Sequence, residues 1–222
     1  TEKEETTVSQ NVKKNETDSS QKSTKITTTK VANPQTKIEA ITKLEALQTC
    51  DISNTCPEDN SDPRASDFLR ANMMVNEINR LSDFNNDPEV ISKIQELLSY
   101  PDGNVQEALL KILAISDPEM SNIDPLLGAL NKSFDAKNSQ LILKELERYP
   151  DAFSQYETIF EQVLKTGSFG ASQELSKSLA PFLTDENREV YEAVLKELNP
   201  NSKKAKNLES ILFEFSMQQN GG

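Results

Sequence analysis

The 222-residue chain contains neither histidine nor tryptophan. Without histidine, the Ser-His and Cys-His pairs on which many nucleophilic enzymes depend cannot form. The two cysteines are too few for a zinc site, which needs about four ligands. The segment TGSFG at residues 166–170 lacks the lysine that a phosphate-binding loop requires. We therefore expect a protein that is not an enzyme and that holds neither a metal nor a cofactor.

One enzymatic alternative stays open, namely glycoside cleavage by paired carboxylates. The candidate side chains are Glu107, Glu145, Glu174 and Glu197, which all fall on polar faces of expected helices. Carboxylates on such faces usually serve solubility. Because the chain also has only four tyrosines and no tryptophan, it offers few aromatic platforms for a sugar. A helical cell-wall glycosidase is the less favoured interpretation.

Negative charge is concentrated away from the N-terminus. The net charge is −12, although residues 1–50 carry eight lysines against seven acids. A domain this acidic is repelled by nucleic acid and by anionic lipid, so we expect no nucleic-acid partner. Long apolar runs are also missing, since none approaches the ~20 residues of a membrane span. Membrane association would thus require an anchor upstream of Thr1.

Residues 1–36 are poor in apolar side chains. They contain five apolar residues and no aromatic residue, whereas 13 of them are Ser or Thr. Ordering such a segment would not be offset by burial of apolar surface. We expect a disordered linker over 1–36 and a short disordered tail over 218–222.

From residue 34 onward the pattern is helical, because glycine is rare and apolar residues recur at helical spacing. Asp, Asn, Ser and Thr mark the helix starts, where a side-chain oxygen accepts from otherwise unpaired N–H groups. The sequence predicts an all-α fold of about ten helices. Two cover about 35–49 and 65–82, and the others begin at or near Asp87, Asp102, Asp124, Asp135, Asp151, Gly170, Thr184 and Asn201.

Helix pairs recur along the chain. They open near Pro88, Ser121, Asp151 and Asp185, about 30–34 residues apart, which is the spacing of a two-helix repeat. Such a pair cannot bury its apolar face alone, so successive pairs would stack. The alternative is an irregular helical bundle with chance spacing.

Two segments, SYPDGNVQEALLKIL at 99–113 and DAKNSQLILKEL at 135–146, resemble the second helix of a HEAT-like repeat. The resemblance implies a short α-solenoid of stacked antiparallel helix pairs over residues 87–217. A helical cap over 37–86 would precede it.

The cysteines lie in the segment TCDISNTCP, residues 49–57. Their spacing differs from the C-x-x-C pattern of redox pairs. The residues between them favour a turn, which could bring Cys50 and Cys56 to bridging distance. We expect a disulfide, with two free cytosolic thiols as the alternative. A disulfide is typical of an exported protein.

The disulfide, the Ser/Thr/Lys-rich linker and a start at Thr1 instead of Met are together similar to a mature bacterial lipoprotein. We expect an exported protein of the periplasm or outer cell envelope, lipid-anchored through a residue upstream of Thr1. Its expected function is that of a protein-binding scaffold or adaptor. A pilotin-like assembly factor for an outer-membrane component is the alternative.

The HEAT-like resemblance also implies a binding face, because the second helices of such pairs line the concave side. Another protein would be the partner. The residues implied on this face are Asn104, Glu107 and Lys111, then Gln140, Lys144 and Glu147, and finally Gln173, Glu174 and Lys177.

Overall fold

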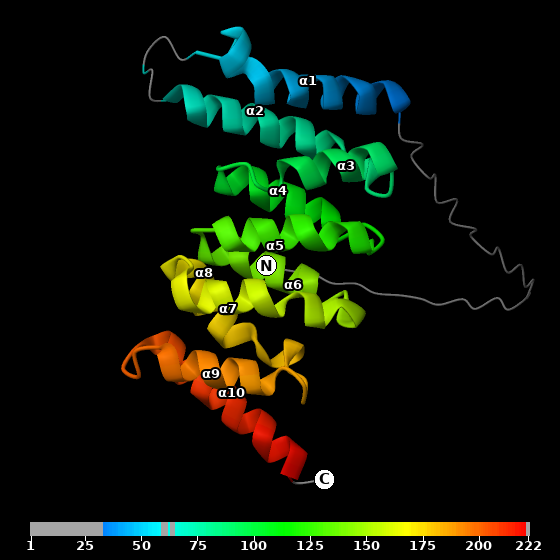
Figure 1. Cartoon of the computed structure of the whole chain (residues 1–222). Helices are drawn as coiled ribbons and strands as arrows, with labels where there is room; N and C mark the ends of the chain where they lie inside the picture. Colours follow the sequence, from blue (N-terminus) through cyan, green and yellow to red (C-terminus); the bar gives the residue numbers. More distant parts are fainter. Residues whose placement is uncertain (1–32, 59–61, 63–64, 221–222) are drawn as a thin grey trace, which may run out of the picture. The chain divides into compact units, whose positions relative to one another are not determined.

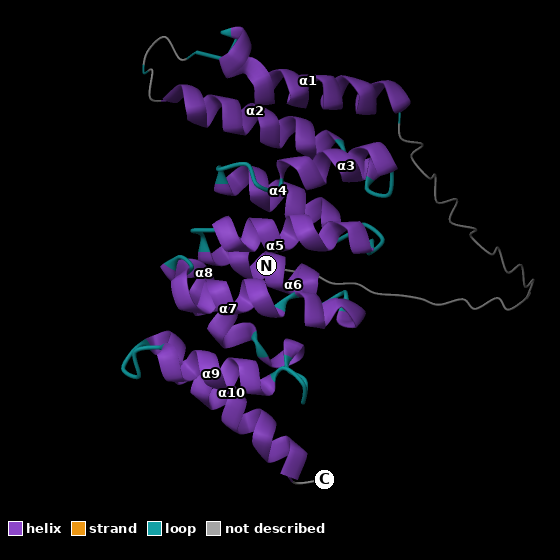
Figure 2. Cartoon of the chain, in the orientation of Figure 1, coloured by secondary structure: helices purple, strands orange, loops and turns teal. Residues whose placement is uncertain are grey.

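The structure, a computed structural model, describes residues 33–58, 62 and 65–220. Most of the predicted linker over 1–36 lies outside the described residues, and so do 221 and 222. All regular elements in the described part of the chain are helices (Figure 2). None of these described helices is both long enough and apolar enough to cross a bilayer.

Ten α-helices follow one another within the described residues, with short 3-10 helices between some of them (Figure 1). The α-helices are α1 (Pro34–Ser53), α2 (Ser66–Arg80), α3 (Pro88–Leu97), α4 (Gly103–Leu113), α5 (Ile123–Lys132), α6 (Ala136–Leu146), α7 (Glu157–Thr166), α8 (Phe169–Ser178), α9 (Arg188–Glu197) and α10 (Lys203–Asn220). The 3-10 helices are η2 (Ser82–Phe84), η3 (Met120–Asn122), η4 (Pro150–Gln155) and η5 (Ala180–Phe182).

The α-helices form two layers. Each odd-numbered helix packs on the next odd-numbered one, each even-numbered helix packs on the next even-numbered one, and the two helices of a pair contact each other. Figure 1 shows that the helices of a pair run in opposite directions. The described chain is therefore a stack of antiparallel pairs, which confirms the fold class predicted from the spacing.

The same N-cap hydrogen bond occurs at the start of four even-numbered helices. Asp102, Asp135, Ser168 and Ser202 each accept a bond from a backbone N–H in the first turn that follows. These residues are 33 or 34 positions apart. Because a side-chain oxygen at this position satisfies N–H groups that have no helical partner, the repeat is encoded in the caps as well as in the apolar pattern.

Polar side chains also tie two of these helices, α6 and α8, to the preceding pair. Asn138 at the start of α6 donates to the carbonyl of Gly103 at the start of α4, at 2.9 Å. One pair further along, the Ser168 hydroxyl donates to the carbonyl of Ser133, at 2.6 Å. These bonds fix the register of one pair on the pair before it.

The buried apolar residues form one continuous cluster that runs from α1 to α10. Its largest side chains lie around α7, where the rings of Tyr156, Phe160 and Phe182 are 5.1–5.9 Å apart, centroid to centroid. The Tyr156 hydroxyl donates to the carbonyls of Leu146 and Tyr149, and burial raises the pKa of Tyr156 to about 12. The core therefore joins α6 to the following pair.

Some helix boundaries differ from the prediction. Helix α1 begins at Pro34, inside the predicted linker, because Asn33 caps it and Pro34 has no N–H to lose. It continues to Ser53, past the predicted end at about residue 49, and ends where Asn54 adopts φ 53°. At the other end, α10 reaches Asn220 and so includes part of the predicted tail over 218–222.

Two predicted caps do not begin α-helices. The 3-10 helix η3 leads directly into α5, so the chain is already helical before Asp124. Asp151 lies in η4, and α7 begins only at Glu157. The side chain of Ile38 in α1 is 53% exposed, although this apolar residue lies at helical spacing from the buried Ile41.

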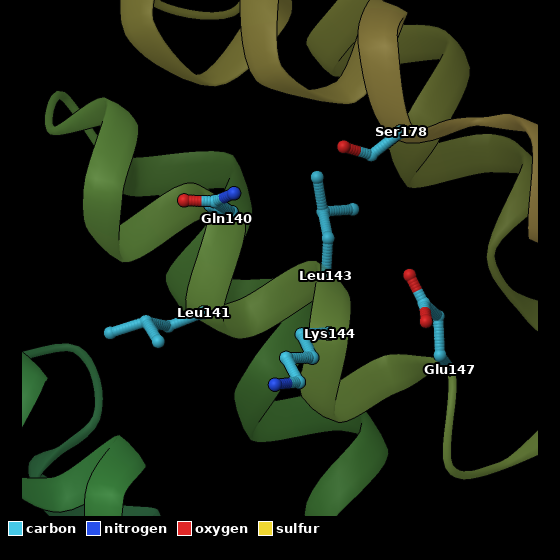
Figure 3. Close-up of a pocket in the computed structure, with 6 residues that line it drawn as sticks. All are labelled: Gln140, Leu141, Leu143, Lys144, Glu147 and Ser178. Atoms are coloured by element: carbon cyan, nitrogen blue, oxygen red, sulfur yellow. The ribbon is translucent and has the colours of Figure 1, made fainter.

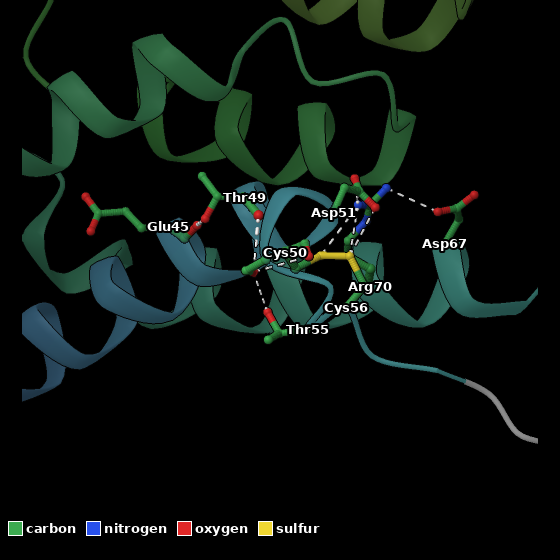
Figure 4. Close-up of a disulfide and its surroundings, with 9 residues drawn as sticks. Glu45, Thr49, Cys50, Asp51, Thr55, Cys56, Asp67 and Arg70 are labelled. Atoms are coloured by element: carbon green, nitrogen blue, oxygen red, sulfur yellow. Dashed lines mark hydrogen bonds and ion pairs between the residues drawn. A yellow bond between two sulfur atoms is a disulfide. The ribbon is translucent and has the colours of Figure 1, made fainter.

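The predicted disulfide is present between Cys50 and Cys56, with 4.6 Å between the two Cα atoms (Figure 4). Arg70 from α2 reaches this turn, where it forms an ion pair with Asp51 and lies 3.6 Å from each sulfur. The disulfide therefore closes the turn at the end of α1, and Arg70 holds this turn against α2. Because the sulfurs are bonded to each other, they are not free to hold a metal ion.

We expect the free energy of unfolding of the double variant Cys50→Ser/Cys56→Ser to be about 2 kcal/mol lower than that of the wild type. The reason is that the small disulfide ring restricts the unfolded chain of the wild type. Urea unfolding without reductant measures this difference. Adding reductant should lower the stability of the wild type by a similar amount and leave the double variant unchanged. Equal stability of the two proteins without reductant would contradict the expectation.

Candidate functional site

The outward face of α4 and α6 carries six of the nine residues predicted to bind a partner. Asn104, Lys111, Gln140, Lys144 and Glu147 are exposed, and Glu107 is half-buried. All six line hollows between neighbouring even-numbered helices. The structure thus brings these residues together on a surface that is both hollowed and charged.

The largest of these hollows lies between α4 and α6 and has a volume of about 450 Å³. Its apolar part is formed by Leu110, Ala114 and Leu141, and its charged part by Lys111, Lys144, Glu145, Glu147 and Arg148. This arrangement of an apolar centre with charges around it is typical of protein interfaces.

A second hollow of about 390 Å³ lies between α6 and α8 (Figure 3). It shares Leu141, Lys144 and Glu147 with the first one. Helix α6 is therefore a ridge between two adjoining hollows. Among the described residues, the side chains of Lys144 and Glu147 make no hydrogen bond or ion pair, so both charges are available to a ligand.

The third hollow, of about 360 Å³, lies between the first turns of α4 and α6. Here Glu107 accepts from Lys111 at 2.8 Å and from Lys137 at 2.7 Å. The hydrogen bond from Lys111, followed by that from Lys137, lowers the pKa of the Glu107 carboxyl. Glu107 is thus an ionised link between the two helices at neutral pH.

Helix α8 contributes less to this face than predicted. Gln173 is only 7% exposed and packs inward. Glu174 is half-buried and forms an ion pair with Lys177 at 2.6 Å. Of α8, Ser178 lines the second hollow instead. The predicted residues of α8 therefore do not continue the surface that those of α4 and α6 form.

Sequence reasoning missed the apolar part of the site. Leu141 is half-buried and lines two hollows. A signal existed in the doubled apolar residues Leu141-Ile142, which widen the apolar stripe of α6 beyond the part that packs inward.

The prediction that Glu145 lies on a polar face was wrong, because its side chain is 4% exposed. Arg148 donates to both of its carboxylate oxygens, at 2.7 and 3.0 Å, and the Tyr149 hydroxyl donates to one of them. Arg148 also donates to the carbonyls of Leu113 and Ser116 at the end of α4. A buried carboxylate needs such partners, and here they join α6 to α4.

Each of the four carboxylates considered for glycoside cleavage is ion-paired. Glu107 and Glu145 have the partners described above, Glu174 pairs with Lys177, and Glu197 pairs with Lys165 of α7 at 2.8 Å. The described residues thus define a stacked helical-pair protein with one charged and partly apolar face. In comparisons with known proteins, no family model, no curated protein and no solved structure matches this chain.

Proposed function

We propose that the chain is a non-enzymatic scaffold or adaptor, a HEAT-like α-solenoid that binds another protein through the outward face of α4 and α6. The observation that carries this proposal is the pair of adjoining hollows on either side of α6. They combine the half-buried apolar side chain of Leu141 with the charges of Lys144 and Glu147, whose side chains have no partner among the described residues.

We also propose that the protein works in an oxidising compartment of the bacterial cell envelope. The Cys50–Cys56 disulfide supports this location, because disulfides persist in oxidising compartments and are rare in the cytosol.

The test is capture of envelope proteins from the native host by the immobilised chain. We expect one dominant protein partner for the wild type. The variant Leu141→Ser/Lys144→Glu should reduce its capture by about tenfold, a loss of about 1.4 kcal/mol in binding free energy.

The matched control is Leu195→Ser/Lys196→Glu on α9, where the same two residue types lie next to each other in the opposite layer. This control should capture the partner as the wild type does. Equal capture by both variants, or no partner at all, would contradict the proposal. Capture of an outer-membrane component would identify the pilotin-like alternative, whereas cleavage of peptidoglycan by the wild type would support the glycosidase.

A further inference from the structure

The turns within the helix pairs lie along one edge of the stack, where the even-numbered helices begin (left side of Figure 1). Phe68 at the start of α2, Phe134 before α6 and Phe169 at the start of α8 lie on this edge, with side chains 62%, 88% and 82% exposed. Pro101, just before α4, is exposed as well. We call these four residues the aromatic edge.

The members of the aromatic edge occupy related positions in successive pairs. Pro101 and Phe134 each directly precede the capping residue of an even-numbered helix, Asp102 and Asp135 respectively. Phe169 directly follows the equivalent cap of α8. The repeat that builds the stack therefore also places an exposed apolar side chain at each of these turns.

The members of the aromatic edge adjoin in two places. Phe68 and Pro101 line one hollow of about 380 Å³, together with Arg70 and Tyr100. Between Pro101 and Phe134 lies the 360 Å³ hollow at the first turns of α4 and α6, whose lining is polar. Beyond it, the carbonyl oxygen of Phe134 lies 2.6 Å from where a Cβ on Gly170 would be, so the last two turns are in contact.

The rings of Phe134 and Phe169 contribute little to folding, because they bury little surface within the chain. Single exposed apolar residues are normal, but a row of them on one edge marks an interaction site. Aromatic rings are also well suited to binding, since they offer a large rigid surface with few rotatable bonds.

The charges along the edge favour a cationic ligand. Asp102 and Asp135 each use one carboxylate oxygen as a cap, and Asp67 is 90% exposed although it is ion-paired with Arg70. Arg70 also pairs with Asp51, and Lys137 pairs with Glu107. Lys132, at the end of α5, is exposed at this edge, but the acidic side chains here still outnumber the basic ones. Carboxylates beside exposed rings attract Lys or Arg side chains of a ligand.

The spacing of the turns selects the conformation of the ligand. Packed helices lie about 8–10 Å apart, whereas a polyproline II segment has three residues per turn and advances about 9 Å per turn. Every third residue of such a segment would therefore face the next member of the aromatic edge. An α-helical ligand advances only about 5.4 Å per turn and does not match this spacing.

We propose that the aromatic edge binds an extended, proline-rich segment of a partner protein, in which proline or another apolar residue recurs at every third position and Lys or Arg lies between. The inference rests on the proposed function in that the array binds protein. It adds a neighbouring surface, which adjoins the face of α4 and α6 at the 360 Å³ hollow, and a chemical class of ligand. Rings packed against proline side chains in the polyproline II conformation are a common mode of recognition.

The test uses a fluorescent synthetic peptide of about twelve residues, a repeat of Pro-Ser-Lys, which spans about 37 Å as polyproline II. The control peptide has the same composition, with prolines out of the three-residue period. By fluorescence anisotropy, we expect the full chain to bind the periodic peptide about tenfold more tightly than the control peptide. Phe134→Ser and Phe169→Ser should each weaken this binding about tenfold, which corresponds to about 1.4 kcal/mol.

The matched variant is Phe213→Ser, which removes an exposed phenylalanine of α10 that lies away from this edge. It should bind the periodic peptide as the wild type does. Equal affinity for the two peptides, or an equal loss in Phe134→Ser and Phe213→Ser, would overturn the inference. The inference would also be overturned if Phe134→Ser/Phe169→Ser still captured the partner whereas Leu141→Ser/Lys144→Glu did not. That result would still support the proposed function.

Discussion

Replacing Leu146 with alanine is expected to lower the free energy of unfolding by about 2–5 kcal/mol. The Leu146 side chain is fully buried, and α6 packs against α4, α5 and α8, so the cavity cannot collapse easily. Urea unfolding measures the loss. Ile115→Ala serves as the control, because this aliphatic side chain is exposed and its removal should change the stability by less than about 0.5 kcal/mol.

The location of the damage is as informative as its size. In a stack, stability comes from the pairs and from contacts between nearest neighbours, so a loss can stay local. Native-state hydrogen exchange on Leu146→Ala should show faster opening in α5, α6 and α7. Helices α1 and α2 should change less. Uniform acceleration from α1 to α10 would indicate a globally cooperative bundle and contradict the nearest-neighbour view.

Replacing Arg148 with alanine should cost about 3 kcal/mol of stability, because it leaves the buried carboxylate of Glu145 without its ion-pair partner. The substitution also removes the donors to the carbonyls of Leu113 and Ser116 at the end of α4. Chemical unfolding measures the loss.

A second substitution separates these two effects. In Arg148→Ala/Glu145→Gln the buried charge is gone, so the double variant should be more stable than Arg148→Ala alone. The comparison variant is Arg188→Ala, which breaks the exposed pair with Glu192 and should change the stability by less than about 1 kcal/mol. Equal losses in Arg148→Ala and Arg188→Ala would mean that Arg148 does not support Glu145.

Local features explain which parts of the fold could be predicted. The caps Asp87, Asp102 and Asp135 are read from the sequence because a short side chain bonds to a backbone N–H two or three residues away. The helical period and the repeat of about 33 residues are read from the apolar pattern. The disulfide was predictable because Cys50 and Cys56 are close in the sequence and are the only pair available.

The remaining features depend on contacts between pairs, about 30 residues apart, which a local pattern does not contain. Glu145 looks like a solvent-exposed helix residue until Arg148 and the end of α4 are placed around it. Gln173 is buried and Leu141 half-buried because of how α8 and α6 pack against their neighbours. Phe134 and Phe169 have apolar side chains, but only the structure shows that they face away from the core.

The bonds from Asn138 to Gly103 and from Ser168 to Ser133 have a consequence for how the chain can change in length. Each joins the start of one even-numbered helix to the equivalent region of the previous pair. The caps Asp135 and Ser168 occupy equivalent positions at the starts of α6 and α8, 33 residues apart. We expect a stack with this repeat to lengthen or shorten by one helix pair at a time, about 9 Å each.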